Sequence, residues 1–271
     1  MVTIIASHPR ATVIGVDLSA MRVPRIAVAT IAVVLVAGGG AFTVDAVSAS
    51  RVEAEISARV DSAASDPAPG DPGPARAPAV SIGGPTSRWT DPDTLTTVTI
   101  RAEDVLRPGL GPVAVEAHAR GVEMRDGEPM HAESVEVSAQ LTGDSLAPAL
   151  GMRNVLVGAA DDPSLAGGTE HRARLTGTLL DSGETVSVIV DLVVDPSGAH
   201  LVPVAAATGP AGVPDQDTDL ALASTALTLD PDLLPLGVPV QHLTVTGGTI
   251  TASGTGGPGT PPLDDLLRRD L

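Results

Sequence analysis

The feature that most constrains the fold is an alternation of apolar and polar residues at every second position between Val80 and Gly254. In one such segment Val98 and Ile100 share a face, whereas Arg101 belongs to the opposite face. A period of two is typical of a β-strand with one buried face and one solvated face. The other alternating segments are 113–118, 135–140, 172–180, 185–194 and 199–205, with a last pair around 247–248. The pattern therefore predicts a mostly β domain.

Turn and helix signals lie between these segments. Asp181–Glu184 and Asp195–Gly198 contain the Asp and Gly residues that hairpin turns favour. Helix signals are few: Asp144 or Ser145 is expected to cap a short helix, and Asp230–Pro231 to open a short turn. The expected fold class is therefore α+β and mostly β, a curved, mainly antiparallel sheet with one or two packed helices.

The apolar faces of these strands must be aliphatic, because hydrophobic residues make up 43% of the chain and aromatic residues only 1%. The few predicted helices are not enough to cover such a sheet. One interpretation is closure into a sandwich or barrel with a filled core. The other is a tube that holds a lipid chain, whose burial gains about 0.8 kcal/mol per CH₂ group. On the second interpretation the residues predicted to line the cavity are Val98, Ile100, Val113, Val115, Val135, Val137, Leu175, Val186, Val188, Val190, Leu192, Leu243 and Val245.

An uncharged run, Ile26–Val44, follows Arg22 and Arg25 and precedes Asp45. It is long enough to cross a bilayer, which takes about 20 residues, and the preceding arginines predict a cytoplasmic N-terminus with everything after Asp45 exported. A cleavable signal peptide is the alternative, because Val47–Ala49 offers small residues to a signal peptidase. A membrane anchor is preferred, since hydrophobic regions of signal peptides are usually about 7 to 15 residues long. A buried helix of a soluble fold is the third interpretation.

These signals divide the chain into parts. Val52, Ile56 and Val60 recur at four-residue spacing, which predicts a helix that either extends the membrane helix or packs on the domain. The Pro-rich stretch after it suits a semi-rigid spacer. The predicted parts are a cytoplasmic N-terminus (1–25, with Met21 as an alternative start), a transmembrane signal anchor (26–48), a juxtamembrane helix and linker (49–79), a lipid-binding domain (80–254) and a flexible C-terminal tail (255–271). The expected location is the cell membrane, crossed once, with the domain outside the cytoplasm.

Composition and spacing argue against several classes of function. A net charge of −17 makes nucleic-acid binding unexpected, and the absence of cysteine excludes thiolate chemistry. The six histidines are scattered, and the pairs Asp161–Asp162 and Asp264–Asp265 are expected to be solvated charges. No nucleophile elbow, phosphate-binding loop or dinucleotide motif occurs. We therefore expect no catalytic residue, no metal and no cofactor, and a protein that is not an enzyme.

The order of several segments resembles the actinobacterial LmeA-like phospholipid-binding family. The resemblance covers 80–254 and the preceding apolar segment and helix. Its elements are VSIGG (80–84), LTTVTIRAEDV (95–105), VEAHARGVEM (115–124), HAESVEVSAQLTGDSLAPAL (131–150), RARLTGTLL (172–180), GAHLVPVA (198–205) and LLPLGVPVQHLTVTGGTITASGTG (233–256). One departure follows Gly83–Gly84, where the family usually continues with Phe-Pro but this chain has Pro85–Trp89. Trp89, the one aromatic residue of the predicted exported part, is a candidate for a lipid entrance or a membrane interface, and the alternative is that it fills the core.

The resemblance implies a half-barrel of the tubular lipid-binding class, in which a helix lies along a curved sheet with lipid tails between them. It also implies a phospholipid or polyprenyl-lipid ligand, a role in envelope glycolipid biogenesis and an envelope glycosyltransferase as partner. The alternative function is a non-catalytic interaction or scaffold module, which predicts a filled core and an exposed patch. A glycan hydrolase would need paired carboxylates in a cleft, and the spacing of the acidic residues does not support one.

Overall fold

The computed structural model describes residues 50–62, 76–83, 94–125, 127–160, 171–207, 212–214 and 216–267. All of them belong to one compact unit, Ser48–Leu271. The predicted cytoplasmic segment, the predicted anchor, most of the linker, Trp89 and Asp161–Asp162 lie outside the described residues. None of the helices in the described part is long and apolar enough to cross a membrane.

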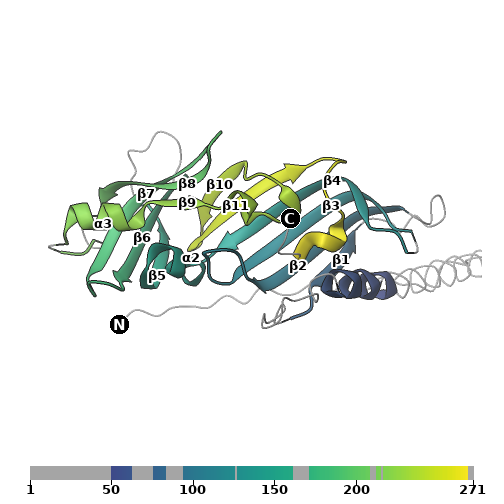
Figure 1. Cartoon of the computed structure of the whole chain (residues 1–271), viewed down its shortest axis with the longest axis horizontal. Coiled ribbons are helices and arrows are strands. Elements are labelled where there is room, and N and C mark those ends of the chain that lie inside the picture. Colours follow the sequence, from purple (N-terminus) through teal and green to yellow (C-terminus); the bar gives the residue numbers. More distant parts are fainter. Residues whose placement is uncertain are drawn as a thin grey trace, which may run out of the picture. The chain divides into compact units, whose positions relative to one another are not determined.

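Two sheets form this unit, and all pairings between their strands are antiparallel (Figure 1). The first has the order β1-β2-β3-β4-β11-β10 and the second β5-β6-β7-β8-β9. The strands of the first sheet are β1 (Ala79–Gly83), β2 (Thr94–Val105), β3 (Val113–Glu123), β4 (His131–Leu141), β10 (His242–Thr246) and β11 (Thr249–Gly256). Those of the second are β5 (Met152–Ala159), β6 (Arg172–Leu179), β7 (Thr185–Asp195), β8 (Gly198–Ala206) and β9 (Leu227–Leu229).

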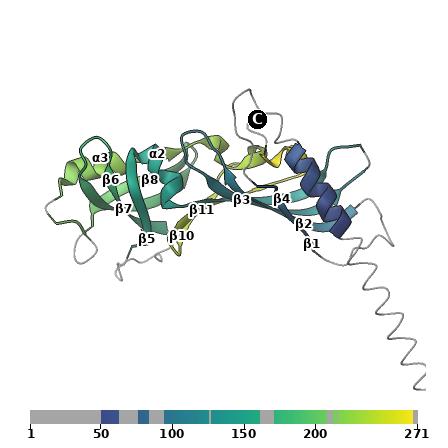
Figure 2. The same ribbon diagram turned by 90° about the horizontal axis from the view of Figure 1, so that it is seen from below.

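The mostly β, curved antiparallel architecture is confirmed, and the first sheet curls as a half-barrel (Figure 2). The strands form two sheets, however, where a single curved sheet was predicted. The chain leaves the first sheet after β4 and returns through β10, which contacts β5, β6 and β7 of the second sheet. The alternation of apolar and polar residues indicates which side chains face the core, but it does not indicate which strands pair.

The predicted strand faces are correct. Along β2, Val98 and Ile100 are buried, whereas Arg101 is exposed. The turn Asp181–Glu184 joins β6 to β7 as expected, and Gly247–Gly248 joins β10 to β11.

The stripe on the helical segment 50–62 packs on the domain. Val52, Ile56 and Val60 are at most 5% exposed and belong to the hydrophobic core. Two hydrogen bonds tie the segment to β1 and the residue before it: the backbone N–H of Ile82 donates to Glu53 Oε1 (3.1 Å), and Ser57 Oγ donates to the carbonyl of Pro78 (2.7 Å). Figure 2 shows this helix, in dark blue, beside β1 and β2. Of the two roles considered for the stripe, packing on the domain is therefore the one observed.

The predicted helix near Asp144 exists as α2 (Gly143–Leu150), but neither expected residue is its cap. The N-cap is Thr142, whose hydroxyl accepts from the backbone N–H of Ser145 (3.3 Å), while Ser145 Oγ accepts from the backbone N–H of Thr142 (3.2 Å). This reciprocal arrangement is a capping box. Ser145 lies at its third helical position, where Glu or Gln is usual, so the motif was not recognised in the sequence.

A second short helix, α3 (Thr218–Thr225), was not predicted. Its N-cap Asp217 accepts hydrogen bonds from the backbone N–H groups of Asp219 and Leu220, both at 3.1 Å. With the separately predicted helix 50–62, the described residues contain three α-helical segments, and the two that lie within 80–254 agree with the one or two packed helices expected there.

Three short 3₁₀ helices follow in the C-terminal part: η4 (Pro231–Leu233), η5 (Pro235–Gly237) and η6 (Leu263–Leu267). The chain around η5 crosses the apolar face of β11 so closely that a Cβ atom at Gly254 would lie 2.1 Å from the carbonyl oxygen of Pro239. The absence of a side chain at Gly254 therefore allows this segment to cover the sheet.

The predicted flexible tail is wrong for Leu263–Leu267. Leu263, Leu266 and Leu267 are at most 4% exposed and belong to the core. The backbone N–H of Leu263 donates to the carbonyl of Met130 (2.8 Å), and that of Met130 donates to Asp264 Oδ2 (2.7 Å). Asp264 is thus a hydrogen-bonded anchor, not the solvated charge that was expected, because its apolar neighbours dock on the sheet and bring it to the backbone.

Candidate lipid-binding site

The predicted cavity-lining residues are brought together in one place. All thirteen belong to a single hydrophobic cluster that spans both sheets, and none is more than 7% exposed. The cluster also includes side chains of the helix 50–62 and of the 3₁₀ segments, which cover the apolar face of the first sheet. That these residues line a lipid cavity stays a prediction.

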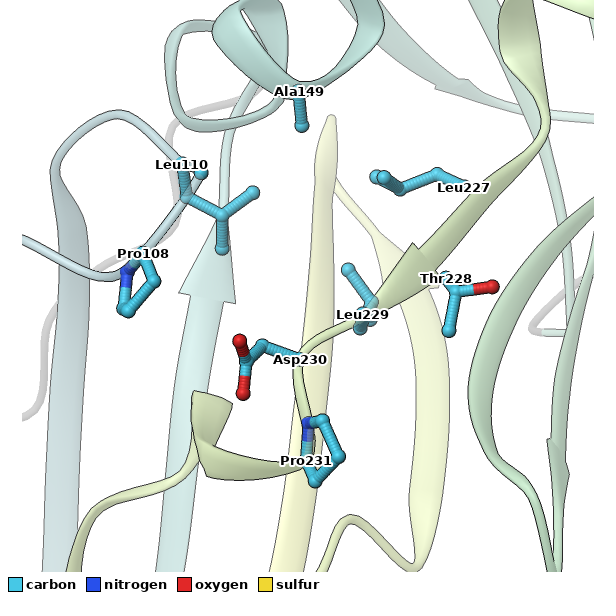
Figure 3. Close-up of a pocket in the computed structure, with 9 residues that line it drawn as sticks. Pro108, Leu110, Ala149, Leu227, Thr228, Leu229, Asp230 and Pro231 are labelled. Carbon is cyan, nitrogen blue, oxygen red and sulfur yellow. The ribbon is translucent and has the colours of Figure 1, made fainter. Parts of the chain in front are cut away.

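A pocket of about 220 Å³ opens beside this cluster, where four parts of the chain meet (Figure 3). They are the β2–β3 connection, the end of α2, β9 and the turn into η4. The lining residues are Pro108, Gly109, Leu110, Ala149, Leu227, Thr228, Leu229, Asp230 and Pro231.

Local hydrogen bonds shape the walls of the pocket. In the β2–β3 connection Gly109 has a φ of 72°, and the backbone N–H of Leu110 donates to the carbonyl of Arg107 (3.1 Å), which closes a tight turn. The backbone N–H of Gly111 donates to the carbonyl of Ser145 (2.8 Å) and ties this turn to α2. These contacts hold the β2–β3 connection against the helix.

On the opposite side, Asp230 caps η4 by accepting from the backbone N–H of Asp232 (2.8 Å). In Figure 3 the leucines and Ala149 face the cavity, and the carboxylate of Asp230 also points toward it. Pockets for small molecules usually measure about 300–1,000 Å³. This pocket therefore fits part of a lipid, such as a headgroup region or a length of acyl chain.

Arg107, next to the pocket, is an unusual buried cation. It is 7% exposed, and its Nε and Nη2 atoms are buried with no hydrogen-bond partner. Burial lowers the pKa of its guanidinium, and the negative charge of Asp232 opposes that shift.

The other buried polar side chains of the described residues all have partners. Ser145 takes part in the capping box, Ser187 Oγ lies 2.7 Å from Thr176 Oγ1, and Thr225 Oγ1 donates to the carbonyl of Ala221 (2.9 Å). Buried polar groups in native proteins are nearly always hydrogen-bonded. Arg107 is the exception among them.

A second pocket, of about 320 Å³, has a different chemistry. It carries three acidic side chains and is lined by Glu103, Asp104, Pro112, Val113, Ala114, Gln140, Thr142 and Asp144. Among the described residues no group of three or more acidic, His or Cys side chains is arranged to hold a metal ion. The acidic lining is unfavourable for an acyl chain or a lipid phosphate.

Comparison with known families gives a match to the LmeA-like phospholipid-binding model over residues 39–255. The chain belongs to this family. The LmeA-like match includes every strand of the first sheet except the last residue of β11, and all of the second sheet. Neither the curated proteins nor the solved structures that were compared yielded a match.

Sequence reasoning identified the LmeA-like family and the aliphatic faces, but it missed the pocket and Arg107. An arginine followed by Pro-Gly is typical of an exposed turn, because arginine is almost never fully buried unless it is paired. The pocket residues come from three segments that are far apart in the sequence, and they share no motif. No local signal in the sequence indicates either feature.

Proposed function

We propose that this protein is a non-catalytic phospholipid-binding protein of the cell envelope, held at the membrane by the predicted segment 26–48 with its domain outside the cytoplasm. The observation that carries the proposal is the LmeA-like phospholipid-binding match over most of the chain. The aliphatic cluster and the adjoining pocket are compatible with it, because both offer surfaces that suit acyl chains.

The finer parts of the proposal concern the ligand and its use. The alternative ligand is a polyprenyl-linked precursor, since its apolar chain needs the same kind of aliphatic binding surface as an acyl chain. We further propose a role in envelope glycolipid biogenesis, in which the domain delivers or senses the lipid for an envelope glycosyltransferase. The acidic charge of the chain makes nucleic acid an unsuitable partner.

An interaction module is the competing function, and two observations favour it. The apolar face of the first sheet is covered by the chain's own segments, as a filled core requires. In addition, Val202 and Val204 on β8 are 41% and 42% exposed, which offers a small apolar surface to a protein partner.

Native mass spectrometry of the compact unit 48–271, exported in a lipid-rich host, separates the two functions. Bound phospholipid at a defined stoichiometry supports the lipid-binding function. A folded protein that stays lipid-free when offered phospholipids and polyprenyl phosphates supports the interaction module.

A matched pair of variants then tests the pocket. Ala149→Phe places a ring in the pocket from α2 and is expected to lower lipid occupancy, whereas Ala223→Phe adds the same ring at an exposed position of α3 and is expected to leave it unchanged. Equal occupancy in both variants would place the lipid outside this pocket.

A further inference from the structure

The two unpartnered nitrogens of Arg107, Nε and Nη2, lie on the same edge of its guanidinium group. In a guanidinium group, the Nε–H and one N–H of Nη2 point in the same direction and match the spacing of two oxygens of a carboxylate or phosphate. Arg172 uses this same edge in this chain: its Nε and Nη2 both donate to the carboxylate of Asp191. In Arg107 the corresponding edge is buried and without an acceptor.

An acceptor-free buried guanidinium is costly for the folded state. Each buried donor without a partner loses its hydration without compensation, and the loss is larger for a charged group. Asp232 attracts the charge of Arg107, but neither Nε nor Nη2 makes a hydrogen bond to it. The edge is therefore complementary to an anionic acceptor, and none of the residues that the structure describes supplies one by a hydrogen bond.

Arg107 lies next to the pocket along the chain, although its own side chain is not one of those that line it. Arg107 directly precedes Pro108–Leu110, which form one wall, and it interacts electrostatically with Asp232, which directly follows the wall residues Asp230–Pro231. Pro108, Gly109, Pro231 and Asp232 are all exposed, so the turns on either side of the pocket lie at the protein surface. Both nitrogens are shielded from solvent, and binding therefore requires the residues that cover them to shift.

We propose that the Nε–Nη2 edge of Arg107 binds two oxygens of a phospholipid headgroup phosphate, while the adjoining pocket takes the first part of the acyl chain or the glycerol. This inference rests on the proposed phospholipid-binding function and adds a headgroup site to it. The single charge of a phosphodiester matches the single charge of the guanidinium. Asp230 and Asp232 disfavour a dianion at the same place more strongly than a monoanion, because they repel each negative charge that the ligand carries.

Photo-crosslinking of the full chain in a non-ionic detergent, free of other phospholipids, tests the inference. The probes are a phosphatidylglycerol and a diacylglycerol that carry the same photoreactive acyl chain, so that they differ only in the headgroup. Labelled peptides are mapped to 94–125 and 226–240, which contain the β2–β3 connection and the turn into η4.

The variants are Arg107→Met, which keeps the length but removes the charge, and Arg107→Lys, which keeps the charge but loses the planar two-donor edge. Arg120→Met makes the same change as the first variant at an exposed position of β3 and serves as the matched control. We expect both Arg107 variants to need about tenfold or more phosphatidylglycerol for half-maximal labelling. Arg120→Met should label as the wild type does, and the diacylglycerol should label weakly in every case.

Each other outcome has a distinct meaning. Unchanged labelling of the Arg107 variants overturns the headgroup site but leaves phospholipid binding intact. A wild type that is labelled by neither probe overturns the proposed function as well. Loss of labelling when inorganic phosphate is present at only the concentration of the probe would show that free phosphate binds the edge at least as well, and it would overturn the headgroup assignment. Labelling of Arg107→Lys at the wild-type level would show that a point charge is enough, which contradicts the two-donor geometry.

Urea unfolding of the same variants distinguishes a ligand site from an internal ion pair. Because the buried guanidinium lacks acceptors, Arg107→Met is expected to be at least as resistant to urea as the wild type without lipid. Equal losses of stability in Arg107→Met and Asp232→Asn would instead show that the two side chains pair with each other in solution. That result would overturn the inference.

Discussion

Replacing Ile56 by alanine tests whether the helix 50–62 belongs to the folded domain. Ile56 is fully buried, at 0% exposed, in the cluster that also contains Val52 and Val60. The substitution removes the γ and δ carbons, which is worth about 2–3 kcal/mol at about 0.8 kcal/mol per CH₂ group. The cavity left behind adds to this loss, so the free energy of unfolding should fall by about 3–4 kcal/mol, within the range typical of Ile→Ala changes.

Urea denaturation of the unit 48–271, followed by circular dichroism, measures this change. Arg51→Ala on the same helix is the control, because Arg51 is exposed and its loss should alter stability by about 0.5 kcal/mol or less. If Ile56→Ala unfolds at the same urea concentration as this control, the helix does not contribute to the core in solution. The stripe would then belong to an extension of the membrane segment, and the packing argument would be refuted.

Three further predictions concern other parts of the fold. Leu266→Ala in the C-terminal segment, at a residue that is 0% exposed, should lower the free energy of unfolding by about 2–5 kcal/mol in the same assay, whereas a mobile tail would tolerate it. Gly143→Ala should destabilise by about 1–3 kcal/mol or more, because its Cβ would lie 1.8 Å from the carbonyl oxygen of Val155; a wild-type melting temperature would contradict this. Hydrogen bonds from Ser197 lower the pKa of Asp195, and a nearby histidine has a smaller effect in the same direction. The variant Ser197→Ala should therefore raise the pKa of Asp195 in an NMR titration. An unchanged pKa would count against this assignment.

The lowered pKa of Asp195 also predicts how the stability of the protein changes with pH. Because the pKa of Asp195 is lowered in the folded state, its ionised form is favoured by folding. The contribution to stability is present above the ordinary carboxyl pKa and is lost as the pH falls through the lowered value. The variant Ser197→Ala should therefore show a weaker loss of stability on acidification than the wild type.

Some features of this protein are fixed by short-range patterns. The alternation around Val98 and Ile100 gave the buried face of a strand correctly, because side chains of an extended chain point to opposite sides in turn. The turn Asp181–Glu184 was found because Asp and Gly suit tight turns. The four-residue spacing of Ile56 and its neighbours indicated a helix with one apolar stripe, although not which surface the stripe covers.

Other features depend on residues that are far apart in the sequence. The division into two sheets depends on which strands pair, and the contacts of β10 with β5, β6 and β7 bring the two sheets together; no alternation pattern encodes either. The order in Leu263–Leu267 comes from Asp264 and Leu263 bonding to Met130, more than a hundred positions earlier in the chain. In the sequence this segment resembled a weakly amphipathic tail.

The sequence by itself determined the class of the protein: an aliphatic, mostly β domain of the LmeA-like phospholipid-binding family. Only the tertiary structure decided where a polar group is left without a partner. Arg107 is in a Pro-Gly turn that would be solvated in isolation, yet its side chain is 7% exposed in the folded domain, with two of its nitrogens lacking a partner. Burial is a property of all the surrounding segments together, so the local sequence around an arginine does not encode it.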